Sequence, residues 1–570
     1  MDPFLDPPAP VQFGPNPIDN AVDGRPTDAI WQNNRLTFVS TYPCTPTGDS
    51  GQHDCVRVST LSTAALPSAP TIFQDMLIAD VGKDSYMGGV GYAGNGTLHV
   101  VWTRSSATAG DFPSSFYAFQ LPTDAANTRS ASVALSGGVG TGAYTGERWG
   151  DYVGVAQDPI VPSAVWQANQ YAGGGNEWKT YVSRLQPKGT TYFPITPVRV
   201  LDTRINRALS GPFSAGVPRT WAVAANWGIP ANAVAVTGNV TVVGQTAAGY
   251  VAVTPTPVNP PPSSTINFPT KDNRANNLVV PLSATGSLSA VYRAGSGNKT
   301  HLIFDVTGYF LANDNGATFK TIAPARVLDT RSNTGLPGKF TNGTARQLQV
   351  TGVAVPPGAT AITGNLTVTG QSAAGFLSVS PDVPAANPTT SNLNFPVSDN
   401  RANGLYAPLD GAGKLWIVYK SGVVGAQTHV ILDVTGYFVH DLTGLRFVPM
   451  NPARIMDTRS SAVLSQLHNP FNANSARILA VDFHWGVPPG TDAVTGNLTV
   501  TGQTGGGFVS MSPTVPPPVP ATSTLNFPLG DSRANGLVAP LNGSGDTYLV
   551  YVGASGKKTD LILDLSGYFE

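Results

Sequence analysis

The residues best suited to chemistry are arginines and aspartates that recur at fixed positions in three stretches of the chain. Arginine forks onto carboxylates and phosphates, so one interpretation is a threefold site for an acidic or hydroxylated polymer. The other is an internal Asp–Arg network that pins strand ends, and the local cancellation of charge favours it. The repeated residues are Arg199, Asp202, Arg204, Asp272, Arg274, Asp305, Arg326, Asp329, Arg331, Asp399, Arg401, Asp433, Arg454, Asp457, Arg459, Asp531, Arg533 and Asp564.

Other catalytic patterns are weaker. GDSG at 48–51 resembles the nucleophile loop of chymotrypsin-like proteases, but no histidine precedes it to serve as the base. A hairpin tip explains these residues, and we predict no catalytic residue in the chain. The seven histidines form no HExxH pattern, and neither C-x-x-C nor a complete calcium loop is present. No cofactor and no metal site are therefore predicted, although calcium bound by irregular turns stays open.

Two cysteines sit in one predicted hairpin. Cys44 and Cys55 are flanked by apolar, β-prone residues and separated by a Gly/Asp/Ser-rich middle, so a disulfide between them is expected, with two free thiols as the alternative. A disulfide implies an oxidising compartment, which places the protein outside the cell or at its surface. The segment MDPFLDPPAPVQFG has neither a basic nor an apolar signal region, and no stretch is long enough to span a membrane.

The elements that position the repeated charges are three copies of one unit. PVRVLDTR (197–204), PARVLDTR (324–331) and PARIMDTR (452–459) open the copies, and DVTGYF, DVTGYF and DLSGYF close them. Alternating apolar and polar residues between Gly/Pro/Asn turns predict an antiparallel β-sandwich of jelly-roll or immunoglobulin-like type in each. We assign repeat 1 to 195–312, repeat 2 to 320–440 and repeat 3 to 447–570, and expect them to stack as a stalk.

Two further features recur in each repeat. A proline-rich loop lies at 254–265, 380–391 and 512–524, and it either protects a sheet edge or contacts a partner or the neighbouring repeat. The sequons at Asn239, Asn365 and Asn497 fall within a predicted strand, which favours a structural use over a sugar. The P-x-R-x-L-D-T-R opener and G-Y-F close resemble a module at the C-termini of secreted bacterial proteins, especially of actinobacteria. That resemblance implies no catalytic activity.

Residues 1–190 follow a different pattern, with three aromatic-rich segments near the ~45-residue length of a propeller blade. They resemble the C-terminal blades of secreted bacterial sialidase-like (BNR) propellers, and the residues that carry the resemblance are Arg148, Trp149, Gly150, Asp151, Tyr152, Asp158, Pro159, Trp166, Tyr171 and Trp178. The resemblance suggests a propeller-face site at Arg148, Trp149, Asp151 and Tyr152, against which stands a role in turns and blade packing. Closed propellers use ~4–8 blades. Either degenerate blades escape notice, or the chain is the C-terminal part of a longer precursor, which we favour.

The composition excludes several classes of function. Only 12% of residues are charged and the net charge is −1, so a nucleic-acid partner is not expected. The 62 Gly and 49 Pro argue against a helical protein, and we predict an all-β chain: a partial β-propeller followed by three tandem antiparallel β-sandwiches. The expected role is a non-catalytic extracellular structural or adhesion protein, including a surface filament or layer subunit. It would associate with itself or with a cell-surface protein or glycan. The alternative is the C-terminal part of a sialidase-like, carbohydrate-active enzyme with glycan-binding repeats.

Overall fold

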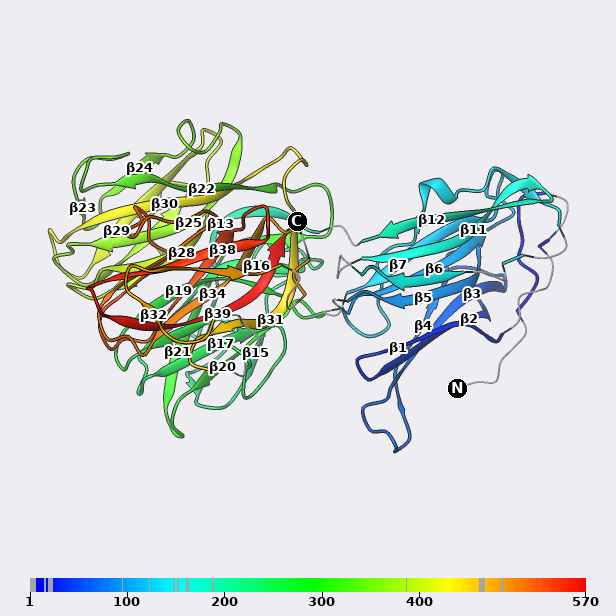
Figure 1. Cartoon of the computed structure of the whole chain (residues 1–570), viewed down its shortest axis with the longest axis horizontal. Helices are drawn as coiled ribbons and strands as arrows, with labels where there is room; N and C mark the ends of the chain where they lie inside the picture. The colour runs from blue at the N-terminus through cyan, green and yellow to red at the C-terminus, as the bar shows by residue number, and fades with distance from the viewer. Residues whose placement is uncertain are drawn as a thin grey trace. The chain divides into compact units, whose positions relative to one another are not determined.

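A computed structural model describes residues 7–14, 17–18, 24–94, 96–121, 124–146, 149–150, 153–159, 164–186, 189–385, 387–460, 467–482, 486–488 and 490–570. The chain separates into an N-terminal unit, Met1–Pro187, and a C-terminal unit, Lys188–Glu570 (Figure 1). Strands dominate both units, as the Gly/Pro-rich composition predicts, and the described residues contain a single 3-10 turn at Ser136–Gly138. The all-β prediction is therefore confirmed.

The N-terminal unit contains three small sheets, which follow the chain order of the three aromatic-rich segments. The first sheet is an antiparallel meander of β1 (Pro26–Gln32), β2 (Arg35–Cys44), β3 (His53–Ser62) and β4 (Thr71–Ile78). The second repeats this order with β5 (Asp84–Tyr92), β6 (Leu98–Ser105), β7 (Ser114–Gln120) and β8 (Val133–Ala134). The third has β10 (Gly154–Gln157), β11 (Val165–Gly175) and β12 (Glu177–Leu185), with β9 (Gly142–Tyr144) parallel to β11.

These three sheets stack face to face through two apolar cores. Val39, Val56 and Val58 of the first sheet pack against Val100 and Trp102 of the second. A separate core joins the opposite face of the second sheet to the third and contains Val101, Tyr117, Val165 and Leu185. The middle sheet is thus buried on both faces, whereas each outer sheet is buried on one.

Each repeat of the C-terminal unit is an antiparallel sandwich, as predicted. A five-stranded sheet packs on a four-stranded one, and the topology is the same in all three. Repeat 1 has β13 (Thr191–Asp202), β21 (Lys299–Leu311), β16 (Ala235–Val243), β19 (Arg274–Pro281) and β14 (Phe213–Ser214), then β15 (Arg219–Ala222), β20 (Ser287–Arg293), β17 (Gly249–Thr254) and β18 (Ile266–Phe268).

Repeats 2 and 3 follow with equivalent strands. Repeat 2 has β22 (Thr318–Asp329), β30 (Gln427–Val439), β25 (Ala359–Thr369), β28 (Arg401–Pro408) and β23 (Phe340–Thr341), then β24 (Ala345–Gln349), β29 (Lys414–Ser421), β26 (Gly375–Ser380) and β27 (Leu393–Phe395). Repeat 3 has β31 (Phe447–Asp457), β39 (Lys558–Phe569), β34 (Ala493–Thr501), β37 (Arg533–Pro540) and β32 (Phe471–Asn472), then β33 (Ala476–Ala480), β38 (Asp546–Gly553), β35 (Gly507–Ser512) and β36 (Leu525–Phe527).

The larger sheet of each sandwich is buried on both faces. In β16, Val236, Val240 and Val242 enter the core of repeat 1. The alternate residues are buried as well: Asn239 bonds to Ser391 of repeat 2, and Thr237 bonds to the Tyr192 hydroxyl. Polar residues that alternate with apolar ones along a strand usually face solvent, but here they lie at the interface between repeats.

The predicted stalk is wrong for the C-terminal unit, because its three repeats close around a shared core. The first strand of each repeat bridges to another repeat: Tyr192 N donates to Ala317 O at 2.8 Å, Phe319 N to Leu445 O at 2.8 Å and Thr190 N to Phe447 O at 2.7 Å. The side chains of all three repeats then form one buried cluster, whose aromatic members are Tyr192, Phe310, Phe319, Tyr406, Phe438, Phe447 and Phe569. The three repeats of this single chain are therefore arranged with pseudo-threefold symmetry.

Candidate functional site

The repeated charges form two different networks, of which the first lies inside each sandwich. Arg199 on β13 stands opposite Asp305 on β21 and binds it with two hydrogen bonds, Nε–Oδ1 at 2.8 Å and Nη2–Oδ2 at 3.0 Å. Arg199 also contacts Asp202 at 3.1 Å, and Asp202 binds Arg204 at 2.7 Å. This network fixes the register of the opening strand against the closing strand.

Repeats 2 and 3 reproduce this network. Arg326 binds Asp433 at 2.8 Å, and Arg454 binds Asp564 at 2.9 Å. Burial raises the pKa of Asp433 and Asp564 even beside these arginines. The outer carboxylate behaves differently: hydrogen bonds from the Arg331 side chain lower the pKa of Asp329 to about 2. Every residue of the set is engaged by another member of it.

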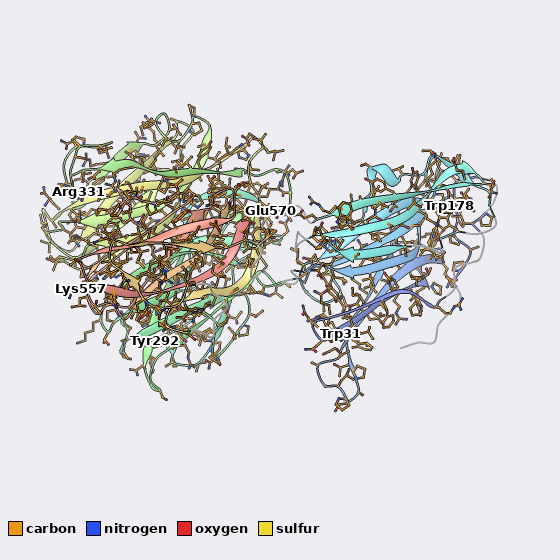
Figure 2. All side chains as sticks on the ribbon, viewed as in Figure 1. Trp31, Trp178, Tyr292, Arg331, Lys557 and Glu570 are labelled. Atoms are coloured by element: carbon orange, nitrogen blue, oxygen red, sulfur yellow. A yellow bond between two sulfur atoms is a disulfide. The ribbon has the colours of Figure 1, made fainter. Side chains whose placement is uncertain are left out.

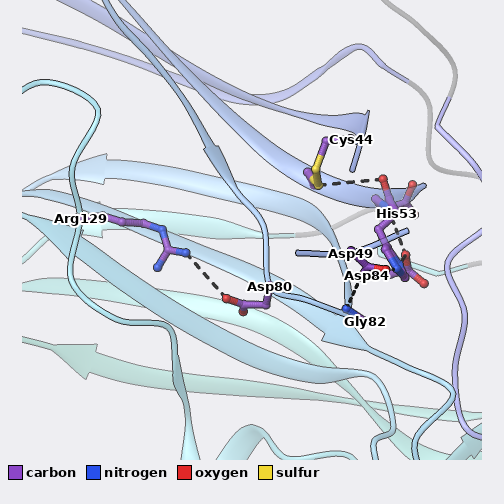
Figure 3. The surroundings of a disulfide bond; sticks show 9 residues. Cys44, Asp49, His53, Asp80, Gly82, Asp84 and Arg129 are labelled. Carbon is purple, nitrogen blue, oxygen red and sulfur yellow. Dashed lines mark hydrogen bonds and ion pairs between the residues drawn. A yellow bond between two sulfur atoms is a disulfide. The ribbon is translucent and has the colours of Figure 1, made fainter. Parts of the chain in front are cut away.

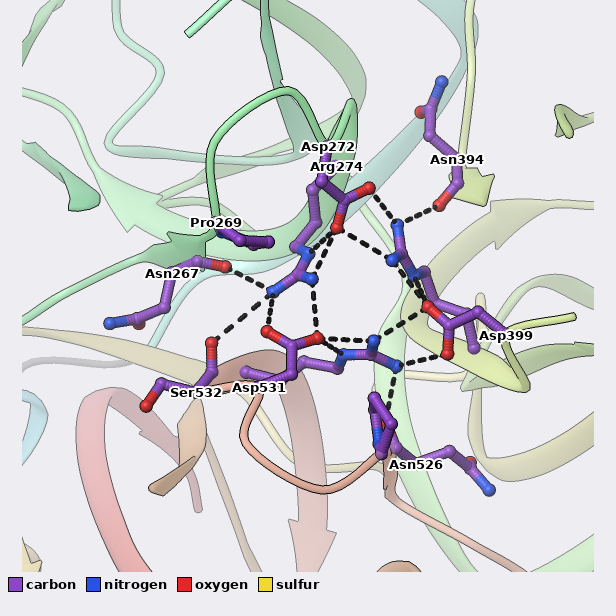
Figure 4. A network of polar contacts seen from close by, with 12 residues as sticks. Asn267, Pro269, Asp272, Arg274, Asn394, Asp399, Asn526, Asp531 and Ser532 are labelled. Atoms are coloured by element: carbon purple, nitrogen blue, oxygen red, sulfur yellow. Dashed lines mark hydrogen bonds and ion pairs between the residues drawn. The ribbon is translucent and has the colours of Figure 1, made fainter. Parts of the chain in front are cut away.

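The second network is a closed ring between repeats (Figure 4). Arg274 of repeat 1 binds Asp531 of repeat 3 at 2.7 Å, Arg533 binds Asp399 of repeat 2 at 2.8 Å, and Arg401 binds Asp272 of repeat 1 at 2.9 Å. Each arginine also binds the aspartate two residues before it in its own repeat, at 2.5 to 2.6 Å. Three positive and three negative charges alternate, so the ring is neutral.

The ring is nearly closed to solvent. The side chains of the three arginines are 2–3% exposed and those of the three aspartates 14–15%. Burial alone would oppose ionisation of Asp272 and Asp531, but the two arginines beside each outweigh it and hold the pKa of both below its usual range. Each guanidinium also donates to a backbone carbonyl of its own repeat, at Asn267, Asn394 or Asn526. The ring therefore has no donor left for a ligand.

A layer of asparagines lies beside the ring and has the same cyclic order. Asn403 Nδ2 donates to Asn239 Oδ1 at 2.8 Å, and Asn276 and Asn535 donate in the same way to Asn497 and Asn365. All three sequon asparagines are thus used in contacts between repeats. Arg-Ala-Asn recurs at 274–276, 401–403 and 533–535, but nothing in the sequence of one copy indicates that these asparagines bond across copies.

The proline-rich loops end on the neighbouring repeat. Ser391 N donates to Asp305 Oδ2 of repeat 1 at 3.1 Å, and Asn239 Nδ2 donates to Ser391 O at 2.6 Å. Asn497 binds Ser264 O at 2.7 Å, and Asn365 binds Ser523 O in the equivalent way. The sequence left open whether these loops protect a sheet edge or contact a partner or the neighbouring repeat. Their ends contact the neighbouring repeat.

The suggested propeller-face site falls mostly outside the described residues. Arg148, Asp151 and Tyr152 lie there, whereas Trp149 is buried and packs edge-on against Tyr144 with ring centroids 5.0 Å apart. Trp149 therefore acts as a core residue of the N-terminal unit. The other three positions keep the status of a prediction.

The predicted disulfide between Cys44 and Cys55 is present at the end of the β2–β3 hairpin (Figure 3). The GDSG segment forms the tip of this hairpin, as expected, and the Asp49 carboxylate accepts hydrogen bonds from the backbone of Ser50, Gly51 and Gly82. His53 lies between two carboxylates, 3.1 Å from Asp49 and 3.0 Å from Asp84. These contacts tie the hairpin tip to the start of the second sheet.

Asp54, which the sequence did not single out, is a strongly perturbed acid of the N-terminal unit. Its side chain is fully buried, and neither carboxyl oxygen has a hydrogen-bond partner among the described residues. Burial, with a smaller contribution from the charge of Asp84, raises the pKa of Asp54 to about 8. Asp54 thus holds a proton at neutral pH.

The described residues contain neither a metal-binding cluster nor a membrane-spanning helix. Among the described residues, no group of three His, Cys, Asp or Glu side chains is arranged to hold a metal ion. None of the helical structure described there has the length and apolar character needed to cross a bilayer.

Comparison with known proteins adds weak structural neighbours. No protein family and no curated protein matches the sequence. Among solved structures, the exo-β-1,3-galactanase of Phanerochaete chrysosporium bound to galactose aligns over 75% of this chain and 100% of its own, with 10% identity and a TM-score of 0.18. The sialidase of Trypanosoma rangeli covers 76% and 95% at 10% identity and 0.17, and the exo-inulinase of Aspergillus awamori 76% and 97% at 11% and 0.16. At these TM-scores, the likeness supports no argument about function.

Proposed function

We propose that the protein is a non-catalytic extracellular scaffold that assembles with itself or binds cell-surface partners. The observation that carries the proposal is the ring of Arg274, Arg401 and Arg533. The guanidinium and carboxylate groups of the ring bind one another across the repeats and hold the three sandwiches together. A unit held together in this way presents its loops and sheet faces to its surroundings.

Two other observations support the proposal. The Cys44–Cys55 disulfide fits an oxidising compartment. The low charge of the chain leaves little electrostatic repulsion between copies, which favours contact-driven assembly.

The test combines a hydrolysis assay with a binding assay on the full chain. We expect no product release from β-1,3-galactan, a sialoside or inulin, and concentration-dependent retention on cell-wall polysaccharide or on whole cells. Turnover of any of these substrates above a heat-denatured control would contradict the non-catalytic role. Failure of the protein to bind any surface and to self-associate would remove the scaffold role.

A second candidate, a carbohydrate-active enzyme, is favoured by one observation. Asp54 is a carboxylic acid that stays protonated at pH 7, as the general acid of a glycoside hydrolase must. Full burial of Asp54 argues against access by a substrate. If turnover were found, an Asp54→Asn variant would have to abolish it for this candidate to stand.

A further inference from the structure

The outer face of the first sheet in the N-terminal unit has an apolar part, beside the Arg57–Asp75 ion pair, whose large side chains no described residue covers fully. The register places Trp31 beside Leu36, Leu36 beside Leu61 and Leu61 beside Ile72, so all four side chains share one face. Trp31 is 61% exposed and Ile72 57%. The opposite face carries Val39, Val56 and Val58 into the core, so the exposed residues form the outer face of the stack.

The third sheet presents a similar face at the other end of the stack. Trp166 pairs with Arg184 and Ala168 with Val182, which puts these residues on the face turned away from Val165 and Leu185 in the core. Val182 is 59% exposed and Trp166 46%. Figure 2 labels Trp31 and Trp178 on opposite sides of this unit.

The three sheets have the arrangement of a partly closed ring. β5 is the first strand of the middle sheet, and it contacts both β1 and β10, the corresponding strands of the other two sheets. Rings of such blades close with ~4–8 members, so three sheets leave two uncovered ends. Two copies of the unit would supply six sheets, which falls within that range.

From these observations, we propose that two copies of the chain pair through the N-terminal unit, with the first sheet of each copy against the third sheet of the other. The two contacts are related by a twofold axis, so the assembly closes at a dimer. This deepens the assembly role proposed above, because it names the partner as a second copy and the surface as these two faces.

The area and composition of the faces suit such a dimer. Strands ~4.8 Å apart that rise ~3.4 Å per residue give each of these sheets a face of roughly 500 Å² at most. Two contacts, each burying two faces, then bury up to about 2,000 Å², at the upper end of the range for specific, stable interfaces. Tryptophan and arginine dominate the binding energy of most interfaces, and the two faces present Trp31, Trp166, Trp178 and Arg184.

Sedimentation velocity on the full chain tests the proposal. We expect a species of twice the 59.2 kDa chain mass, and no growth beyond it as the concentration rises. Trp31→Asp and Val182→Asp should each give monomers, because each lies in both contacts of the dimer. Val424→Asp, at a 95% exposed position in the C-terminal unit, is the matched control and should leave the dimer intact.

Contrary outcomes are distinct. A monomeric wild type, a dimer that survives both substitutions, or open-ended growth would each overturn the closed dimer. Oxidative footprinting of the wild type needs no variant to fold: Trp31 and Trp166 should become protected as concentration rises, and unchanged labelling would also overturn it. A monomer that still binds cell surfaces would exclude the proposed dimer but would be consistent with the scaffold role.

Discussion

The two units solve the same problem of covering sheet faces in different ways. In the C-terminal unit, the second face of each large sheet is buried against the other repeats, and the ring of alternating charges closes on itself after three members. In the N-terminal unit, three sheets also pack together, but the outer two each keep large apolar side chains in contact with solvent on one face.

The difference teaches what closure requires. The repeats carry opposite charges on the two sides of one interface, so three copies satisfy all of them with none left over. The sheets of the N-terminal unit join through apolar contacts that can be extended at either end. Repetition alone does not close a structure. The contact between neighbouring repeats must also bring the last repeat against the first.

The largest effect that would break this comparison is expected at the ring. Arg274→Met leaves Asp272 and Asp531 buried with one arginine each instead of two. Removing one partner of a buried ion pair costs about 3–5 kcal/mol, and we expect that loss in the unfolding free energy of the C-terminal unit. Calorimetry of the full chain measures it, with the transition of the N-terminal unit unchanged.

The matched control for this substitution is Arg331→Met in repeat 2. Arg331 also binds an aspartate, Asp329, at 2.7 Å, but its side chain is 48% exposed. Because Arg331 is half exposed and Asp329 keeps Arg326 as a second partner, the loss should be smaller than at the ring, about 1 kcal/mol. Equal losses for the two variants would show that closure does not depend on the ring.

The N-terminal unit should instead respond to pH through Asp54. A raised folded-state pKa means that the native state holds a proton that the unfolded chain releases above its ordinary value of 3.8, so stability falls as the pH rises from about 4 to 8. We expect a loss of roughly 3 kcal/mol, about half of the full ~1.4 kcal/mol per unit of pKa, because water entry screens part of the charge.

Asp54→Asn removes this titration and checks its source. The variant should gain stability relative to wild type at pH 8, and the gain should vanish near pH 4. Urea unfolding at both pH values measures the difference. A wild-type stability that stays flat across this range, or a variant with the same slope, would exclude Asp54 as the cause.

Much of the fold could be read from the sequence, because its signals are local. Alternating residues and turn-forming Gly and Pro gave the strands and sandwiches, and the spacing of Cys44 and Cys55 gave the disulfide. The pairing of Arg199 with Asp305 is also local to one repeat, where it joins the opening and closing strands.

The packing of the three repeats around one core could not be predicted from the sequence in the same way. Asp272 and Arg274 recur in each copy, but their spacing is identical whether each arginine binds its own repeat, another repeat or both. The polar side chains of Thr237 and Asn239 resemble a solvent-facing row, and only the approach of a second repeat makes them interface residues. Asp54 escaped notice because its environment, rather than its sequence neighbours, raises its pKa.

The smallest expected effect sharpens the comparison at the contact among the three repeats. The equivalent positions are Asn277, Gly404 and Gly536, and a Cβ on Gly404 would overlap the backbone carbonyl of Gly536, while one on Gly536 would overlap that of Asn277. Gly404→Asn should therefore cost about 1–3 kcal/mol through overpacking. Asn277→Gly creates no overlap, and we expect a loss below about 1 kcal/mol. Thermal unfolding of both variants measures the contrast. If Gly404→Asn proved as mild as Asn277→Gly, the repeats would not be in the tight contact that distinguishes this unit from the three stacked sheets.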